Sequence, residues 1–167
     1  MVKKRFLALY LLLFSGCQSP LIAPAQRQTL PDTLTQQIYF SAGEGLPEAR
    51  QQAQQWSADA RLYEISSPWL EQGGISKDWS YHFYSAQASA TYIVHRGTGL
   101  ASPAETPAAY LSPTNWINSP ELSELARLQR LDFPLLSVRL EASGIWVLET
   151  EFQILRIDAY SGHRITG

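Results

Sequence analysis

The stretch that decides the fold is WSYHFYSAQASATYIVHRGTG, residues 79–99. Its first part alternates, because Trp79, Tyr81 and Phe83 are aromatic and the residues between them are mostly more polar. Such period-two alternation puts one set of side chains on each face of an extended chain. Residues 91–94 are rich in β-branched and aromatic side chains, which suit a half-buried strand, and glycines follow. We therefore predict two antiparallel strands joined by a short loop.

A comparable stretch, IWVLETEFQILRIDAYSG, occupies residues 145–162. It also begins near a tryptophan and ends at a glycine, and its second strand is expected at residues 152–157. A helix-like segment and one more candidate strand precede each stretch. The sequence thus predicts an α+β fold of two α-β-β-β halves, residues 46–99 and 119–167, with antiparallel sheet and helices packed on one face. The pattern leaves open whether the halves share one sheet or form two.

Each half is expected to begin with a helix that carries an apolar stripe. The first helix is predicted from about residue 46 or 47 to about 58, because Pro47 suits the first helical turn. Its apolar stripe has helical spacing: Leu46, Ala49, Ala53, Trp56 and Ala60. We expect Trp56 to be a core residue. The second helix is marked by Ser119 as N-cap and Pro120 at the first helical position, and Pro134 prevents its continuation. Candidate first strands follow at residues 61–65 and 136–141.

The N-terminal segment has the features of a targeting signal. Lys3, Lys4 and Arg5 supply positive charge, and residues 6–14 form an apolar run. This run is shorter than the roughly 20 residues that a helix needs to span a bilayer. The sequence LFSGC, residues 13–17, follows and ends in the single cysteine of the chain. This arrangement resembles the signal peptides of bacterial lipoproteins.

The resemblance implies removal of residues 1–16 and acylation of Cys17. Two or more acyl chains would anchor the protein stably at a membrane. Gln18 stands where an aspartate would imply retention at the inner membrane of a Gram-negative cell, so the resemblance favours the outer membrane if the source has one. An ordinary cleaved signal peptide with a free cysteine is the alternative. Residues 17–45 are expected to be a lipidated N-terminus and a flexible tether.

The charge balance also bears on partners. Removing residues 1–16 removes three of the 13 basic residues and none of the 15 acidic ones, so the net charge becomes 10 − 15 = −5 with neutral histidines. An acidic chain without Lys/Arg clusters does not favour electrostatic binding to nucleic acid or to an anionic membrane surface. We therefore expect no nucleic-acid partner, and membrane attachment through the lipid on Cys17.

Residues 100–118 contain prolines and no sustained periodicity, so we predict a connector between the two halves. Connectors of this length are uncommon unless they have a function. The aromatic residues Tyr110 and Trp116 either pin the connector onto the domain or, together with Trp69, line a groove for a partner. The sequence leaves both alternatives open.

The turn IDAYSG, residues 157–162, follows a predicted helix and three predicted strands. This order and this turn resemble the PepSY and PepSY-like domains of bacterial envelope proteins, and the fold that they imply is PepSY/cystatin-like. The resemblance implies a helix packed across a small antiparallel sheet and a non-catalytic, modulating role. From the residues alone, we expect Asp158 to accept hydrogen bonds from backbone amides near Ser161, with Gly162 at positive φ.

No enzymatic motif accompanies the histidines His82, His95 and His163. The chain lacks His-Glu-x-x-His, Gly-x-Ser-x-Gly and paired Cys/His spacings. We therefore expect no catalytic residue, no cofactor and no metal site, and we interpret the protein as not an enzyme.

The leading hypothesis is a membrane-anchored lipoprotein of the bacterial cell envelope that binds or modulates another envelope protein. The alternative is a structural or assembly lipoprotein that binds lipid or outer-membrane components, which an apolar cavity between sheet and helices would favour. A small hydrolase is the third hypothesis. It would need a pocket that brings a histidine beside a serine and a carboxylate.

Overall fold

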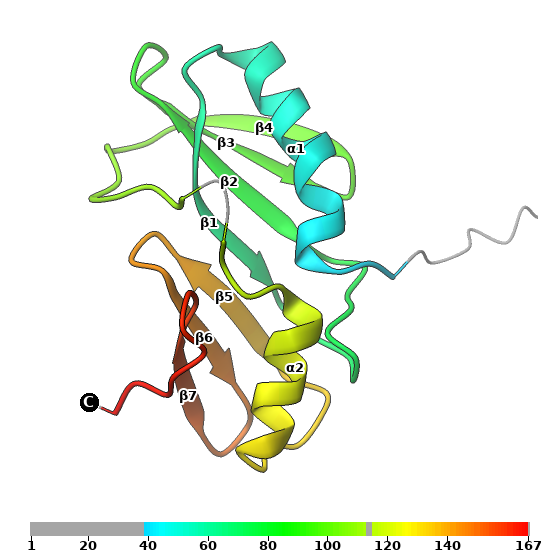
Figure 1. Ribbon diagram of the computed structural model, residues 1–167. Coiled ribbons are helices and arrows are strands. Elements are labelled where there is room, and N and C mark those ends of the chain that lie inside the picture. Colours follow the sequence, from blue (N-terminus) through cyan, green and yellow to red (C-terminus); the bar gives the residue numbers. More distant parts are fainter. Residues whose placement is uncertain (1–38, 113–114, 167) are drawn as a thin grey trace, which may run out of the picture. The chain divides into compact units, whose positions relative to one another are not determined.

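The computed structural model describes residues 39–112 and 115–166. The predicted signal peptide, Cys17 and most of the predicted tether lie outside the described residues. The described residues belong to one compact unit. Its elements follow the chain in this order (Figure 1): α1 (Ala42–Trp56), β1 (Arg61–Ser67), β2 (Ser80–Ser85), β3 (Ala90–His95), β4 (Thr98–Pro103), α2 (Ser119–Leu128), β5 (Ser137–Glu141), β6 (Ile145–Glu149) and β7 (Ile154–Asp158).

All the strands in the described part of the chain belong to one antiparallel sheet of seven strands, in the order β4-β3-β2-β1-β5-β6-β7. The strands that follow the two helices, β1 and β5, lie next to each other inside the sheet. They pair through partners such as Ile65 and Leu140. The later strands then add outward on both sides. The structure thus answers the question that the sequence left open, because the two segments share a single sheet.

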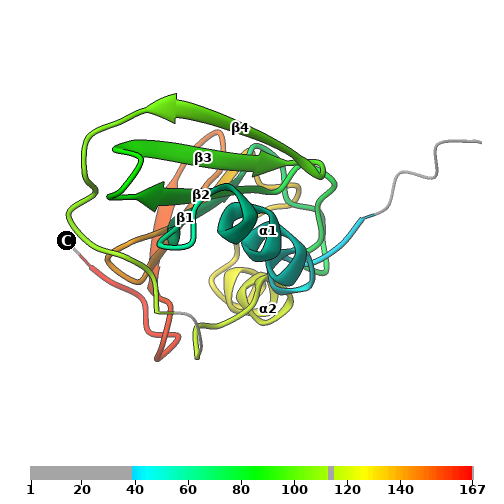
Figure 2. The ribbon, with the colours of Figure 1, turned by 90° about the horizontal axis from the view of Figure 1, so that it is seen from above.

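Both helices cover the same face of this sheet (Figures 1 and 2). The core lies between the helices and the sheet. It contains alternating side chains that the sequence marked, such as Trp79 and Phe83, together with residues outside the strands, and its largest members are almost fully buried: Trp79, Trp146, Phe83, Ile65, Leu70, Leu122 and Leu135. The prediction of an α+β fold with helices on one face is therefore confirmed. Trp56, expected in the core, is only half-buried and stacks on Tyr92 with ring centroids 5.0 Å apart.

Helix α1 begins four residues earlier than predicted, at Ala42. Its N-cap is Ser41, whose hydroxyl accepts from the Glu44 backbone N–H, and the Glu44 carboxylate accepts from the Ser41 N–H in return. This capping box satisfies N–H groups that the first turn leaves without helical partners. Pro47, interpreted as a first-turn residue, instead lies inside the helix. Residues 42–45, expected in the tether, are therefore helical.

The predicted connector also contains a strand that sequence analysis missed. β4 covers residues up to Pro103 and pairs with β3 along its whole length. The residues between these strands, Arg96 and Gly97, both have positive φ, of 48° and 72°, which is the backbone of a two-residue type I′ turn. β4 shows no alternation because it is an exposed edge strand, so no face of it is selected to be apolar. The connector is correspondingly shorter, residues 104–118.

The two tryptophans that mark the halves make the same contact. The indole Nε1 of Trp79 donates to the carbonyl oxygen of Phe40 over 2.8 Å, and that of Trp146 donates to the carbonyl oxygen of Ile117 over 2.8 Å. Each carbonyl belongs to the residue just before a helix N-cap. A buried tryptophan needs one acceptor for its N–H. Here that hydrogen bond holds the residue that precedes the helix N-cap in place.

The N-termini of the two helices contact each other through polar side chains. Asn118, the N-cap of α2, accepts from the backbone N–H of Gly43 over 2.8 Å and donates to the Ser41 hydroxyl over 3.2 Å. The hydroxyl of Ser119 accepts from the Ala42 N–H over 2.9 Å. The start of α2 thus caps two backbone N–H groups of α1, across more than 70 residues of sequence.

Candidate binding surface

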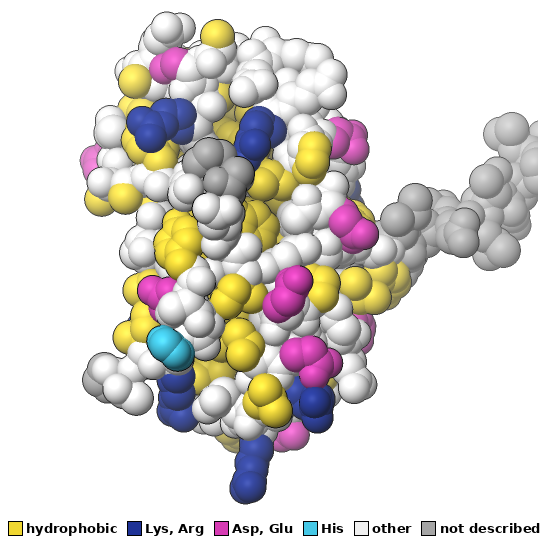
Figure 3. All heavy atoms as spheres, viewed as in Figure 1, with side chains coloured by type: hydrophobic (Ala, Val, Ile, Leu, Met, Phe, Trp, Pro, Cys, Tyr) yellow, Lys and Arg dark blue, Asp and Glu magenta, His cyan; other side chains and the backbone are white. Residues whose placement is uncertain are grey.

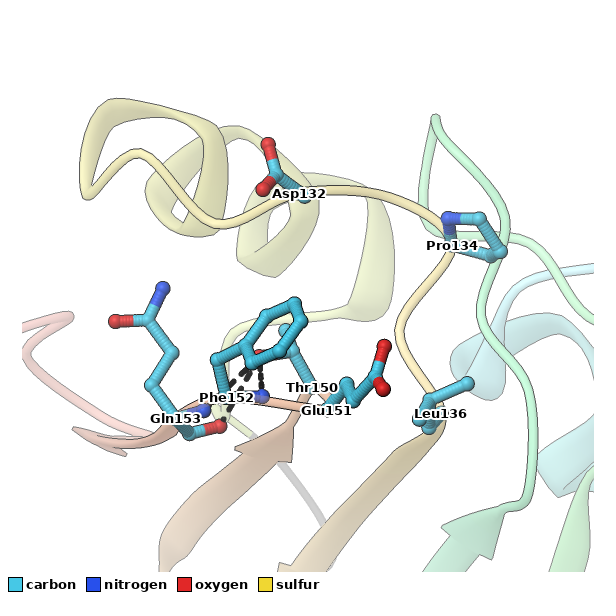
Figure 4. Close-up of a pocket in the computed structure, with 7 residues that line it drawn as sticks. All are labelled: Asp132, Pro134, Leu136, Thr150, Glu151, Phe152 and Gln153. Atoms are coloured by element: carbon cyan, nitrogen blue, oxygen red, sulfur yellow. Dashed lines mark hydrogen bonds between the residues drawn. The ribbon is translucent and has the colours of Figure 1, made fainter.

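A hollow of about 210 Å³ lies between the loop that follows α2 and the hairpin that joins β6 to β7. The loop contributes residues that follow the helix, and the hairpin contributes its turn (Figure 4): Asp132, Pro134 and Leu136 face Thr150, Glu151, Phe152 and Gln153. The loop is held in place by Leu135, which is fully buried and exchanges two backbone hydrogen bonds with Leu70. The hollow is therefore formed by two segments that the sheet positions.

The hairpin turn is organised by Thr150. Its hydroxyl accepts from the backbone N–H groups of Phe152 and Gln153 over 3.3 and 3.2 Å, and its own N–H donates to the Gln153 carbonyl over 2.9 Å. These bonds, which Figure 4 draws as dashed lines, fix the backbone on both sides of Phe152. The Phe152 side chain is nevertheless 86% exposed.

Apolar side chains continue from this turn onto the adjoining strands. Leu136 is 47% exposed and Ile154 is 57% exposed, and they flank the same end of the sheet as Phe152. The charged residues that line the hollow, Asp132 and Glu151, are both acidic. A rigid aromatic residue beside an open, acid-rimmed hollow has the chemistry of a docking surface, since large exposed apolar groups at fixed positions mark interaction sites.

Sequence analysis placed Phe152 in a strand, and the structure corrects this. β7 begins at Ile154 rather than at residue 152, and residues 150–153 form the turn. A signal was present, because a threonine hydroxyl that bonds amides two and three residues ahead is a common turn former. Hydrophobic alternation outweighed it.

The aromatics proposed to line a partner groove do not come together. Tyr110 stacks under the guanidinium of Arg61 at 4.0 Å, at the start of β1, whereas Trp69 lies two residues beyond the end of that strand and donates to Glu71 over 2.6 Å. The intervening strand is roughly 25 Å long at 3.3 Å per residue. Trp116 packs edge-on against the buried Trp146 with ring centroids 5.9 Å apart. Tyr110 and Trp116 thus pin the connector to the domain.

The predicted turn at Asp158 is present. Its carboxylate accepts from the N–H groups of Ser161 and Tyr160 over 2.7 and 3.1 Å and from the Ser161 hydroxyl over 2.8 Å, and Gly162 has φ of 75°. These hydrogen bonds, led by that of the Ser161 backbone, lower the pKa of Asp158. All its contacts are local, so they assign it a role in the turn.

His82 lies beside a serine and a carboxylate on the face of the sheet that the helices leave open. Its Nε2 is 3.3 Å from the Ser66 hydroxyl and 3.7 Å from Glu64. Burial lowers the pKa of His82, against the opposing effect of Glu64. A catalytic triad requires the two ring nitrogens to contact different partners, one the hydroxyl and the other the carboxylate. Here a single nitrogen contacts both, so this geometry does not form a proton relay.

The other histidines have separate surroundings. His95 is hydrogen-bonded through Nδ1 to the Ser80 hydroxyl over 2.9 Å, and the carbonyl of His163 accepts from the Asp158 N–H. Within residues 39–112 and 115–166, no group of three His, Cys, Asp or Glu side chains has metal-binding geometry.

The described residues contain no helix that is long and apolar enough to cross a bilayer. On the face shown in Figure 3, basic side chains lie mainly at the upper and lower ends rather than in a continuous stripe.

The architecture defines an α+β protein with one seven-stranded antiparallel sheet and two helices on one face. No family model matches the sequence, and no curated protein matches it. A solved structure with a similar fold is the crystal structure of a "putative lipoprotein" from Clostridium difficile 630, with a TM-score of 0.50 over 72% of this chain and 90% of that one. The two sequences are 8% identical, so the similarity is one of fold.

Proposed function

We propose that this protein is a lipoprotein of a bacterial cell envelope, anchored through Cys17, whose folded unit docks onto another envelope protein without catalysing a reaction. Two observations support the anchor. The segment of residues 13–17 resembles a lipoprotein processing site, and the structural neighbour of the folded unit carries the name of a lipoprotein. In the Gram-negative case, Gln18 favours the outer membrane.

One observation carries the docking role, namely the exposure of Phe152 on a turn that hydrogen bonds hold in place. Burying such a phenylalanine contributes about 1.5–3 kcal/mol, and little ordering entropy opposes it because the turn is already fixed. Asp132 and Glu151 beside it favour a partner that carries a basic group next to its apolar one. The partner proposed is therefore a protein segment with an apolar side chain flanked by Lys or Arg.

The anchor is tested by mass spectrometry of the mature N-terminus together with Cys17→Ser. Acylated Cys17 as the first residue, and loss of the serine variant from the membrane fraction, are the expected results. An unmodified thiol in a water-soluble exported form would contradict the anchor.

The docking role is tested by placing a photo-crosslinking amino acid at position 152 of the full-length protein in native membranes. Position 128 is the matched control, because Leu128 is also exposed, on the last turn of α2, but does not line the hollow. We expect a protein adduct from position 152 that is absent from position 128 and is weakened by Glu151→Lys. Equal labelling from both positions, or no dependence on the charge at 151, would contradict the proposal.

The same experiment addresses the alternative of a lipid-binding assembly protein. Adducts from position 152 to lipid alone would favour that function. Against it stands the packing beneath α1, where the recess lined by residues such as Phe40, Ala49 and Val94 measures about 50 Å³. A water molecule needs ~10–15 Å³ of such a cavity, so the recess has room for only a few waters and a long acyl chain does not fit.

A further inference from the structure

β4 is the outermost strand of the sheet, and within the described residues it pairs with β3 alone (Figure 2). The phase of its hydrogen bonds follows from the two-residue turn at Arg96–Gly97, which makes the flanking residues His95 and Thr98 a hydrogen-bonded pair. The Ala104 N–H, which donates to the Ser89 carbonyl, continues the same phase. Thr98, Leu100 and Ser102 therefore bond to β3.

The backbone groups of Gly99 and Ala101 consequently point away from the sheet, as does the carbonyl of Pro103. Pro103 has no N–H to offer. Gly99 and Ala101 are small, and the Leu100 side chain between them is 72% exposed. β4 thus presents two backbone donors and three backbone acceptors along the edge of the sheet, at residues with small or cyclic side chains.

The opposite edge of the sheet is protected. On β7, the Asp158 N–H donates to the His163 carbonyl and the Arg156 carbonyl accepts from the Ile165 N–H, so the chain's own C-terminal segment covers this edge. β7 also carries charged residues, whereas β4, TGLASP, carries none. Natural edge strands usually have a charge, a bulge or a cover that prevents pairing. The contrast between the two edges marks β4 as the one that is open to another strand.

We propose that β4 pairs antiparallel with β4 of a second copy of this chain, so that the sheets of the two copies join into one. The register is determined by the donors. When Leu100 lies opposite Leu100 of the second copy, Gly99 exchanges two backbone hydrogen bonds with Ala101 of that copy, and Ala101 exchanges two with its Gly99. A register with Ala101 opposite Ala101 of the second copy would place Gly99 opposite Pro103, which lacks the required N–H.

Side chains agree with this register. The two Leu100 side chains meet on the open face of the sheet, each covering apolar surface that is exposed in one copy. Antiparallel pairing also brings the turn of one copy beside the end of β4 in the other. Arg96 of one copy, whose guanidinium pairs with Asp78 of its own chain and is still largely exposed, then lies next to the exposed Glu105 of the second, on both sides of the two-fold axis.

One strand from each copy buries less than the roughly 1,200–2,000 Å² of a stable soluble complex. We therefore expect weak pairing in dilute solution and stronger pairing on a membrane, where anchoring confines both copies to one surface. This enhancement rests on the proposed lipid anchor, whereas the register does not.

The register is tested by oxidative cross-linking of single-cysteine substitutions in the full-length protein, in liposomes and in concentrated detergent solution. Leu100→Cys places two thiols on directly opposed residues, whose Cα atoms lie about 4.5 Å apart, within the range of a disulfide. Thr98→Cys and Ser102→Cys each place them about 13 Å apart, which is too far. We expect dimers from position 100 and from a mixture of the 98 and 102 variants, but not from either alone. The unaltered chain controls for Cys17.

Ala101→Pro separates pairing from folding. It removes an N–H that points away from β3, so the sheet keeps its internal bonds while the second copy loses two of its four exchanged bonds. We expect the Leu100→Cys dimer to fall at least tenfold in this background, with the circular dichroism spectrum unchanged. Equal cross-linking from positions 98, 100 and 102, adducts to a different protein instead of a dimer, or no dimer in either medium would each overturn the proposal. Unmodified Cys17 with a dimer in concentrated solution would contradict the anchor alone.

Discussion

Asn118 offers the sharpest test of how the two halves are joined. Its carbonyl oxygen accepts from the N–H groups of Ser119 and Gly43, each over 2.8 Å, and its amide donates to the Ser41 hydroxyl over 3.2 Å. One of these bonds is the cap of α2, and two cross to α1. At about 1 kcal/mol for each net hydrogen bond, Asn118→Ala is expected to lower the free energy of unfolding by about 3 kcal/mol.

Two further substitutions at the same position separate the local cap from the cross-helix bonds. Asn118→Ser keeps a capping hydroxyl but is too short to reach α1, so we expect a loss of about 2 kcal/mol. Asn118→Asp keeps both acceptor contacts and places a negative charge between two helix N-termini, which offsets the lost amide donor. We expect its stability within about 1 kcal/mol of the unaltered protein.

The assay is equilibrium urea unfolding of the three variants, followed by circular dichroism. In a thermal unfolding measurement, the melting temperature of the alanine variant should be roughly 10 °C lower for a unit of this size. A serine variant as stable as the unaltered protein would show that the cross-helix bonds contribute nothing. An aspartate variant weaker than the alanine variant would refute the role assigned to the two helix N-termini.

Hydrogen bonds from Ser85, Ser57 and Gln87 lower the pKa of Asp59 to about 2. Its contribution to stability is therefore complete above the unfolded pKa near 3.8 and is lost as the pH falls from there through 2. The urea midpoints at pH 7 and pH 3 should differ less in Asp59→Asn than in the unaltered protein. Gly144→Ala should lower the free energy of unfolding by about 2 kcal/mol or more, because φ is 78° and the Tyr160 ring fills the space. Gly73→Ala, with φ of 92° and open space around it, should lower it by only about 1 kcal/mol. Equal losses by urea unfolding would contradict this difference. Phe152→Ser should change stability by less than about 0.5 kcal/mol because the ring is exposed, and a larger loss by thermal unfolding would show that Phe152 packs against the fold.

Local features of the chain were predictable because they depend on residues a few positions apart. Alternation at Trp79, Tyr81 and Phe83 marked a strand, and the bonds that Asp158 makes lie within three residues of it. Pro120 located the start of α2 within one residue for the same reason, although the N-cap is Asn118 rather than the predicted Ser119. The start of α1 was missed because Pro47 was read as a boundary, although the capping box at Ser41 and Glu44 was visible in the sequence.

The sequence by itself determined most of the segments that form helices and strands, and which face of each is apolar, but it did not reveal β4. Only the tertiary structure decided what covers those faces. It shows that β1 pairs with β5, that Asn118 caps a helix 75 residues away, that Phe152 stays exposed, and that β4 forms one edge of the sheet in the described part of the chain. The physical reason is that periodicity records that a surface is buried, whereas the partner that buries it is chosen by contacts between residues far apart in the chain.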